Sequence, residues 1–146
     1  MAESEIVDVM ERVFSATLKI AHAVPDESLE FWPAPDTMTV REHLDHMAYC
    51  LEELSAPVAA AVGMAPPEGS SDAPCERLSR SITRVLDIFR AVEAIGWDTP
   101  VVMPGDHTMS IRRVALTLIE HDAHHRGQLI VMLRLIGIDP PKRWSD

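Results

Sequence analysis

The sequence predicts an all-α fold in which four amphipathic helices form one bundle, with long irregular connections between them. Apolar residues recur at three- and four-residue steps in four separate segments, which is the spacing of one face of an α-helix. Prolines and glycines are concentrated between these segments, where they end or interrupt helices. At 146 residues with 47% apolar content, the chain has the size and composition of one domain with one core. We therefore expect a single domain over residues 1–146.

The first helix is expected over Glu3–Val24, where the helical spacing of apolar residues continues until a proline stops it. The second helix begins at Thr39, which forms a capping-box pattern with Glu42. In this pattern the two side chains satisfy exposed N–H groups at the start of the helix. Pro57 removes one backbone hydrogen bond, so this helix is expected to kink there or to end between Ser55 and Gly63.

The third and fourth helices follow a connection rich in proline, glycine and serine. The third helix is expected over roughly Cys75–Ile95, where Gly96 can adopt the left-handed conformation that ends many helices. Ser110 is the expected N-cap of the fourth helix, which continues to about Ile136. Between these helices, residues 97–109 form either a brief strand or an extended loop.

Charge and cysteine content exclude several classes of protein. The net charge is −10, whereas proteins that bind nucleic acid do so through clustered cations. The acidic N-terminus is unlike a signal peptide, and no apolar run approaches the roughly 20 residues of a membrane span. A chain of this size with two cysteines needs no disulfide framework. We expect a cytoplasmic protein that binds neither nucleic acid nor membranes.

The fourth helix carries the candidate chemistry, because two histidines lie inside its apolar face. With each residue advancing about 100 degrees around the axis, His121 and His125 fall on one narrow apolar stripe. The apolar residues of this stripe are Val114, Leu118, Leu129, Met132 and Ile136. Buried imidazoles need partners for their polar nitrogens. Histidines at i and i+4 can place ring nitrogens on one ion, as in helical zinc sites.

A histidine pair at this spacing is by itself more often a hydrogen-bonded surface feature than a metal site. A second pair, His43 and His46, lies on another amphipathic helix that must pack against the same core. Three histidines with an open fourth position are typical of catalytic rather than structural zinc sites. Helical periodicity places His43 near the centre of its apolar face and His46 at the edge. The residues alone therefore leave both histidines open as the third ligand.

In the run HDAHHRGQLIVMLRLIGIDPP, a histidine pair precedes an Arg-Gly-Gln step, a leucine-rich turn and a Gly-x-x-Pro-Pro ending. This pattern resembles the signature of the DinB/YfiT-like family. The segment FWPAPDTMTVREHLDHMA is similar to the family's start of the second helix, with a Trp-Pro pair, a capped start and a Leu-x-His ending. The resemblance extends over nearly the whole chain by element order, and these two blocks carry its distinctive residues.

The resemblance implies a DinB-like four-helix bundle, often dimeric, with a divalent transition metal at one end of a cleft between helices. It assigns the ligands to His46, His121 and His125, with His43 as the substitute for His46. Zinc is the first choice for imidazole ligands without a carboxylate, and nickel is the next. Relatives include thiol S-transferases that use low-molecular-weight thiols, a mycothiol-dependent isomerase and proteins with no assigned reaction. The expected partners are a small-molecule substrate and a second copy of the chain.

Two hypotheses of function follow from this resemblance. The first is a metal-dependent enzyme, most concretely a transferase that joins a low-molecular-weight thiol to an electrophilic small molecule, with hydrolysis as a close variant. An open metal position in a pocket would lower the pKa of a bound thiol or water. The second is a non-catalytic, stress-related helical dimer whose histidines hold a structural or incidental ion. It predicts a closed coordination sphere or no pocket.

Other polar residues near the histidines have structural interpretations. His124 lies outside the apolar stripe and is expected at the surface or beside the ligands. Arg126 and Gln128 can hydrogen-bond to ligands, but packing is the favoured role for both. Asp122 is expected to be a solvated carboxylate. Cys50, one turn after the second histidine pair, is expected to be a small buried residue rather than a catalytic thiol.

Overall fold

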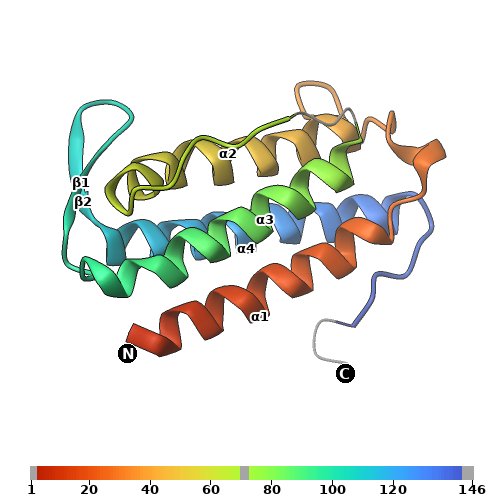
Figure 1. Cartoon of the computed structure of the whole chain (residues 1–146). Helices are drawn as coiled ribbons and strands as arrows, with labels where there is room; N and C mark the ends of the chain where they lie inside the picture. The colour runs from red at the N-terminus through yellow and green to blue at the C-terminus, as the bar shows by residue number, and fades with distance from the viewer. Residues whose placement is uncertain (1–2, 70–72, 143–146) are drawn as a thin grey trace.

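A computed structural model describes residues 3–69 and 73–142 and shows long helices packed along one another (Figure 1). Over these residues the α-helices are α1 (Glu3–His22), α2 (Val40–Ala61), α3 (Pro74–Arg90) and α4 (Ile111–Leu135). Helix α1 contacts α3 and α4, and α2 contacts the same two helices. Their buried apolar residues form one continuous core. The predicted all-α class is confirmed, and within the described ranges no helix is long and apolar enough to cross a membrane.

The helix boundaries follow local capping signals. The Thr39 hydroxyl accepts from the Glu42 N–H at 3.2 Å, and the Thr39 N–H donates to the Glu42 carboxylate at 2.8 Å. This is the capping box that the sequence predicted for α2. Helix α2 continues through Pro57 and ends at Ala61, within the predicted interval. The Ser110 hydroxyl likewise accepts from the Arg113 N–H at the start of α4.

Replacing Thr39 with alanine is expected to lower the free energy of unfolding by about 1 kcal/mol, because the Glu42 N–H loses its acceptor. Urea denaturation followed by circular dichroism measures this change. Thr83→Ala is the matched control, since its exposed hydroxyl bonds only within the middle of α3. Equal stabilities of Thr39→Ala and Thr83→Ala would contradict the capping role.

The C-terminal end of the third helix differs from the prediction. Helix α3 ends at Arg90, and the next four residues form a 3-10 helix, η2 (Ala91–Ala94). The predicted helix extended to Ile95 because the apolar pattern of the sequence continues through the 3-10 helix. The tighter turn of the 3-10 helix still buries Val92, as an α-helix would. A second short 3-10 helix, η1 (Asp26–Ser28), lies in the connection between α1 and α2.

Residues 97–109, expected as a strand or a loop, contain a small antiparallel hairpin. Strand β1 (Pro100–Met103) pairs with β2 (His107–Ser110) at the end of the bundle where α4 begins (Figure 1). Val101 and Met103 are buried, whereas Val102 between them is exposed, so one face of the hairpin packs on the core. The connection between α1 and α2 lies at the opposite end of the bundle (Figure 1).

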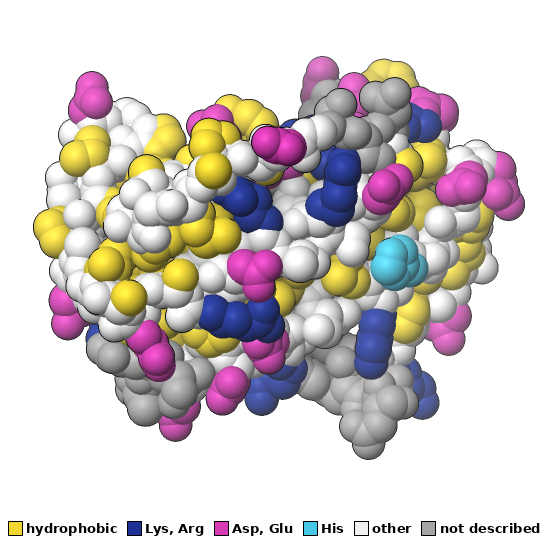
Figure 2. All heavy atoms as spheres, viewed as in Figure 1, with side chains coloured by type: hydrophobic (Ala, Val, Ile, Leu, Met, Phe, Trp, Pro, Cys, Tyr) yellow, Lys and Arg dark blue, Asp and Glu magenta, His cyan; other side chains and the backbone are white. Residues whose placement is uncertain are grey.

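The surface formed by α1 and α3 carries both signs of charge. Figure 2 shows basic side chains on this face with acidic side chains among them. One such group joins the two helices, since Arg90 of α3 bonds Glu11 of α1 at 2.6 Å and its own neighbour Asp87 at 2.8 Å. All three side chains are substantially exposed, so each pair contributes little to stability.

Candidate metal centre

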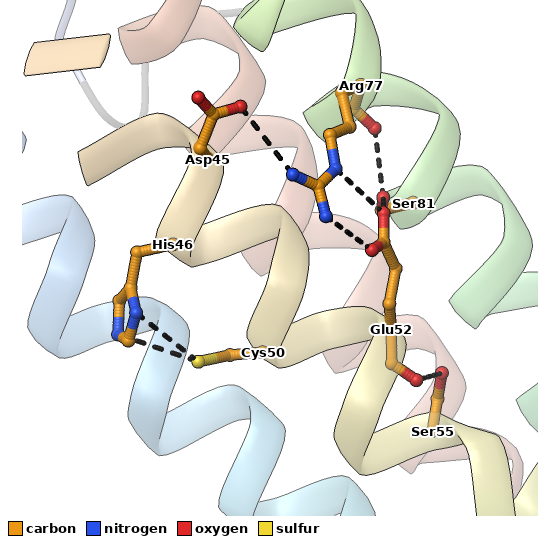
Figure 3. Close-up of polar contacts among 7 residues, drawn as sticks. All are labelled: Asp45, His46, Cys50, Glu52, Ser55, Arg77 and Ser81. Carbon is orange, nitrogen blue, oxygen red and sulfur yellow. Dashed lines mark hydrogen bonds and ion pairs between the residues drawn. The ribbon is translucent and has the colours of Figure 1, made fainter. Parts of the chain in front are cut away.

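The three histidines that the resemblance assigned as ligands lie together between α2 and α4. One nitrogen from each of His46, His121 and His125 lies within 4.8 Å of the other two. His121 and His125 are one turn apart on α4, and their Nε2 atoms are 3.1 Å apart. The ring centroid of His46 lies 4.7 Å from that of His125 and 5.7 Å from that of His121. We call these three residues the histidine cluster; Figure 3 shows His46 extending from α2 toward α4.

The alternative third ligand, His43, lies beside the histidine cluster but is bonded elsewhere. Its Nε2–H donates to the backbone carbonyl of His125 at 3.0 Å, and the side chain is buried. The two rings meet edge to face at 5.0 Å. The sequence correctly placed His43 near the centre of the apolar face, and this position directs it into the core. His46, at the edge of that face, is the α2 histidine that reaches the α4 pair.

The orientation of His125 is set by Gln128, three residues further along α4. The Nδ1–H of His125 donates to Gln128 Oε1 at 3.1 Å, and the Gln128 amide N–H donates to His124 Nε2, also at 3.1 Å. This assignment places the ring proton on Nδ1, so the Nε2 lone pair faces His121. Metal-ligating histidines typically donate from their second nitrogen in this way. Gln128 therefore makes the kind of hydrogen bond that the sequence left open beside a structural role, and His124 is exposed, as expected.

Replacing Gln128 with alanine is expected to weaken zinc binding by about 10–100-fold, because His125 loses the acceptor that holds its ring. Gln128→Glu retains an acceptor and is expected to restore most of the affinity. Competition with a chromophoric zinc chelator measures the change. Glu120→Ala, at another exposed position of α4, is the matched control and should bind as the native chain does. Unchanged affinity in Gln128→Ala would contradict the orienting role.

Three histidines of this region, His43, His121 and His125, have lowered pKa values, which favours the neutral form that binds metals. Burial, together with a smaller effect of the neighbouring His121, lowers the pKa of His125 to about 4. Burial also lowers the pKa of His121 and of His43, with smaller contributions from nearby histidines. A neutral imidazole offers a lone pair without first losing a proton. At neutral pH these rings therefore present nitrogen donors and no positive charge.

Cys50 lies directly beside the histidine cluster, one turn after His46 on α2. Its Sγ is 3.5 Å from His46 Nε2 and 3.9 Å from Nδ1 (Figure 3). Burial raises the pKa of the Cys50 thiol, and the carboxylate of Glu53 raises it further. The protonated thiol is therefore favoured at neutral pH, and Cys50 is half-buried rather than fully buried as expected. That Cys50 is not a catalytic thiol stays a prediction.

The other face of α2 is fixed to α3 by a polar network. Arg77 of α3 donates to both carboxylate oxygens of Glu52 at 3.2 and 2.7 Å, and the Ser81 hydroxyl donates to the same carboxylate at 2.7 Å (Figure 3). Arg77 also lies 3.7 Å from Asp45. Burial opposes ionisation of Glu52, but these hydrogen bonds outweigh it and lower its pKa overall. The network therefore holds the helix that carries His46.

On α4, Asp122 and Arg126 form a buried ion pair that the sequence analysis missed. The Arg126 guanidinium donates to the Asp122 carboxylate at 2.7 Å, and the two side chains are 4% and 3% exposed. Thr17 of α1 donates to Asp122 at 2.7 and 2.8 Å, and Arg126 also donates to the Val13 carbonyl at 2.9 Å. Burial raises the pKa of Asp122 to about 6, against the opposing effects of Thr17 and Arg126. We call Thr17, Asp122 and Arg126 the buried triad.

The expectation that Asp122 is solvated was therefore wrong. Two signals pointed to the buried triad. Asp122 and Arg126 are four residues apart, the spacing at which helical side chains pair. Thr17 lies among the apolar residues of the first helix, where a hydroxyl needs a partner.

Comparison with known proteins agrees with the fold. Residues 10–129 match a family model described as the DinB superfamily. The structure is similar to a DinB-like protein from Bacillus subtilis, with 16% identity, 97% of this chain and 99% of that chain covered, and a TM-score of 0.79. It is also similar to a DinB-like protein from Bacillus cereus, with 22% identity, 94% of each chain covered, and a TM-score of 0.66. No curated protein matches the chain.

Proposed function

The chain belongs to the DinB superfamily, and from that premise we propose that it is a metal-dependent enzyme with ligands His46, His121 and His125. The observation that carries this proposal is the convergence of three imidazoles from two helices on one point. Buried imidazole nitrogens need partners, and a shared ion supplies one to all three. The homodimer and the cytoplasmic location expected from the sequence stay predictions.

The donor set fits a divalent transition metal. Imidazole nitrogens without a carboxylate favour zinc first and nickel next. Two nitrogens bound to one tetrahedral zinc ion lie about 3.3 Å apart, given the usual Zn–N distance. The separation of 3.1 Å between the Nε2 atoms of His121 and His125 is close to this value. His125 also has its second nitrogen bonded to Gln128, as metal-bound histidines require.

Three protein ligands leave one coordination position for a substrate or cofactor. When bound, a divalent ion at such a site lowers the pKa of a thiol or water and favours its anionic form. Imidazole ligands carry no negative charge, so they leave the positive charge of the ion uncompensated. The uncompensated charge favours the anionic form of a bound thiol or water. Gln128 keeps His125 in the ligating orientation. His46 and His121 are only half-buried, which leaves the histidine cluster accessible from outside.

We propose a thiol S-transferase reaction, with hydrolysis as the close variant. The electron pair of a low-molecular-weight thiolate forms a carbon–sulfur bond to an electrophilic small molecule. The leaving group departs with the electrons of the bond that breaks, and the thiol proton passes to solvent. A cavity of about 560 Å³ that includes His125 in its wall supports an enzyme over a protein that holds only a structural ion.

The test combines metal analysis with a transfer assay. The purified chain is expected to hold about one zinc or nickel ion per chain, as one cluster of three ligands allows. Glutathione, cysteine and other small thiols are then mixed with a fluorogenic bimane electrophile, with and without a chelator. Turnover that disappears with the chelator and returns with added zinc supports the proposal. If the protein holds the ion but shows no turnover with any of the thiols, with or without added metal, the result would favour the non-catalytic hypothesis.

A further inference from the structure

Residues of the connection between α1 and α2 line a cavity. This connection lies at the end of the bundle opposite the hairpin (Figure 1). The cavity lies between residues 33–38 and the second half of α4, and its volume is about 560 Å³. Much of its wall is apolar, and the apolar side chains that line it include Met38, Val131, Met132 and Leu135. This volume is within the range of pockets that bind small organic molecules.

The cavity adjoins the histidine cluster at a single ligand. His125 and Gln128 line it, whereas His46 and His121 do not. A molecule in the cavity would therefore contact the hydrogen-bonded pair that sets the orientation of His125. It would also lie beside His43, whose bond to the His125 carbonyl holds the same turn of α4. The cavity is thus next to the candidate metal centre but distinct from its ligand atoms.

The charges around the cavity favour an uncharged occupant. Among the described residues that line it, Asp36 carries a carboxylate and none is a lysine or arginine. The chain as a whole has a net charge of −10. An anion placed against apolar side chains would lose its hydration without gaining a cationic partner. Small thiol cofactors that carry carboxylates therefore do not match this wall.

We propose that this cavity binds the apolar part of an uncharged small molecule beside His125. That this molecule is the electrophilic substrate, rather than the thiol, rests on the proposed function. Binding of an uncharged molecule in the cavity does not depend on the proposed function. The predicted arrangement separates two ligands of opposite character, with the anionic sulfur at the histidine cluster and the apolar electrophile in the cavity.

A matched pair of fluorescent probes tests both the location and the class of ligand. N-phenyl-1-naphthylamine is uncharged, and 8-anilino-1-naphthalenesulfonate is nearly the same molecule with a sulfonate added. Both become fluorescent in apolar surroundings. We expect the uncharged probe to bind at least ~10-fold more tightly than the sulfonate, because none of the described residues of the wall is a lysine or arginine that could offset the buried charge. The comparison is repeated with a chelator present, so that a metal ion on His125 does not contribute. Equal affinities, or no binding of the uncharged probe, would overturn the proposal.

Two variants test whether the probe binds in this cavity. Val131 and Leu135 are 53% and 58% exposed, so Val131→Glu and Leu135→Glu are expected to fold, which thermal unfolding verifies. Each is expected to weaken binding of the uncharged probe by at least ~10-fold, because a carboxylate replaces part of the apolar wall. The matched control is Val102→Glu, since Val102 is 62% exposed on β1 and does not line the cavity. Its affinity should equal that of the native chain.

Probe affinity unchanged in both wall variants, or equally reduced in Val102→Glu, would overturn the location. Metal content is measured on the same samples, and Val131→Glu should retain its ion because it alters no histidine. Failure of the histidine cluster to bind metal would contradict the proposed function and leave the probe result intact. The two proposals can therefore fail separately.

Discussion

Replacing Asp122 with alanine is expected to lower the free energy of unfolding by about 3–5 kcal/mol, because it leaves Arg126 buried without its carboxylate. The guanidinium would keep neutral partners, among them the Thr17 hydroxyl and the Val13 carbonyl, but would lose the Asp122 carboxylate. Domains of this size are stable by roughly 5–15 kcal/mol, so the loss is a large fraction of the total. Urea denaturation followed by circular dichroism measures it.

Asp87→Ala is the matched control for this prediction. Asp87 also pairs with an arginine on its own helix, at 2.8 Å, but its side chain is 52% exposed. Loss of such a surface pair is expected to cost about 0–1 kcal/mol. The double variant Asp122→Ala with Arg126→Met removes both charges and should recover much of the stability lost in Asp122→Ala. Similar losses for Asp122→Ala and Asp87→Ala would show that the buried triad does not stabilise the fold.

Replacing His125 with alanine is expected to weaken zinc binding by more than ~100-fold, which exceeds the usual effect of changing a residue that only orients a ligand. His125 is central to the histidine cluster, since its Nε2 lies 3.1 Å from that of His121 and its ring is near His46. His46→Ala should lose affinity to a similar extent. Competition with a chromophoric chelator, together with metal analysis of the purified variants, measures both effects.

Two other histidines serve as controls for the ligand assignment. His107 is exposed on β2 at the hairpin, so His107→Ala should bind zinc as the native chain does. His43→Ala should retain the ion, because the His43 Nε2 is bonded to a backbone carbonyl and lies outside the histidine cluster. Native metal content in His125→Ala would contradict the assignment, as would loss of metal in His43→Ala with retention in His46→Ala.

The helices were predictable because their signals are local. The capping box at Thr39 and the N-cap at Ser110 each depend on residues within one turn, and both form as predicted. The hairpin was left open because its strands have four residues each and depend on packing of Val101 and Met103 against the core. No pattern within residues 97–109 alone determines that contact.

The candidate site, like the fold, was predictable where it depends on local spacing and not where it depends on how helices pack. Helical spacing alone brings His121 and His125 together, because residues four apart on a helix are neighbours. The third histidine depends on how α2 is rotated against α4, which the periodicity of one helix does not determine. The sequence placed His43 at the centre of the apolar face and His46 at its edge, and both positions were right. The sequence did not show that the edge of the apolar face of α2 lies against His121 and His125 of α4. The buried triad was missed because Thr17 lies 105 residues from Asp122 in the sequence.

The interleaving of two polar groups along α4 has a consequence for how this scaffold can diverge. His121 precedes Asp122 and His125 precedes Arg126, so the histidine cluster and the buried triad share the same two turns. Contacts to α1 through the triad fix the rotation of α4 about its axis, and with it the direction of the histidines toward α2. Exchanging the histidines leaves the contacts of the triad in place, so we expect the chemistry of the site to be changeable without loss of the fold. Replacing Asp122 or Arg126 alone, in contrast, leaves a buried charge without its partner and lowers the stability of the fold.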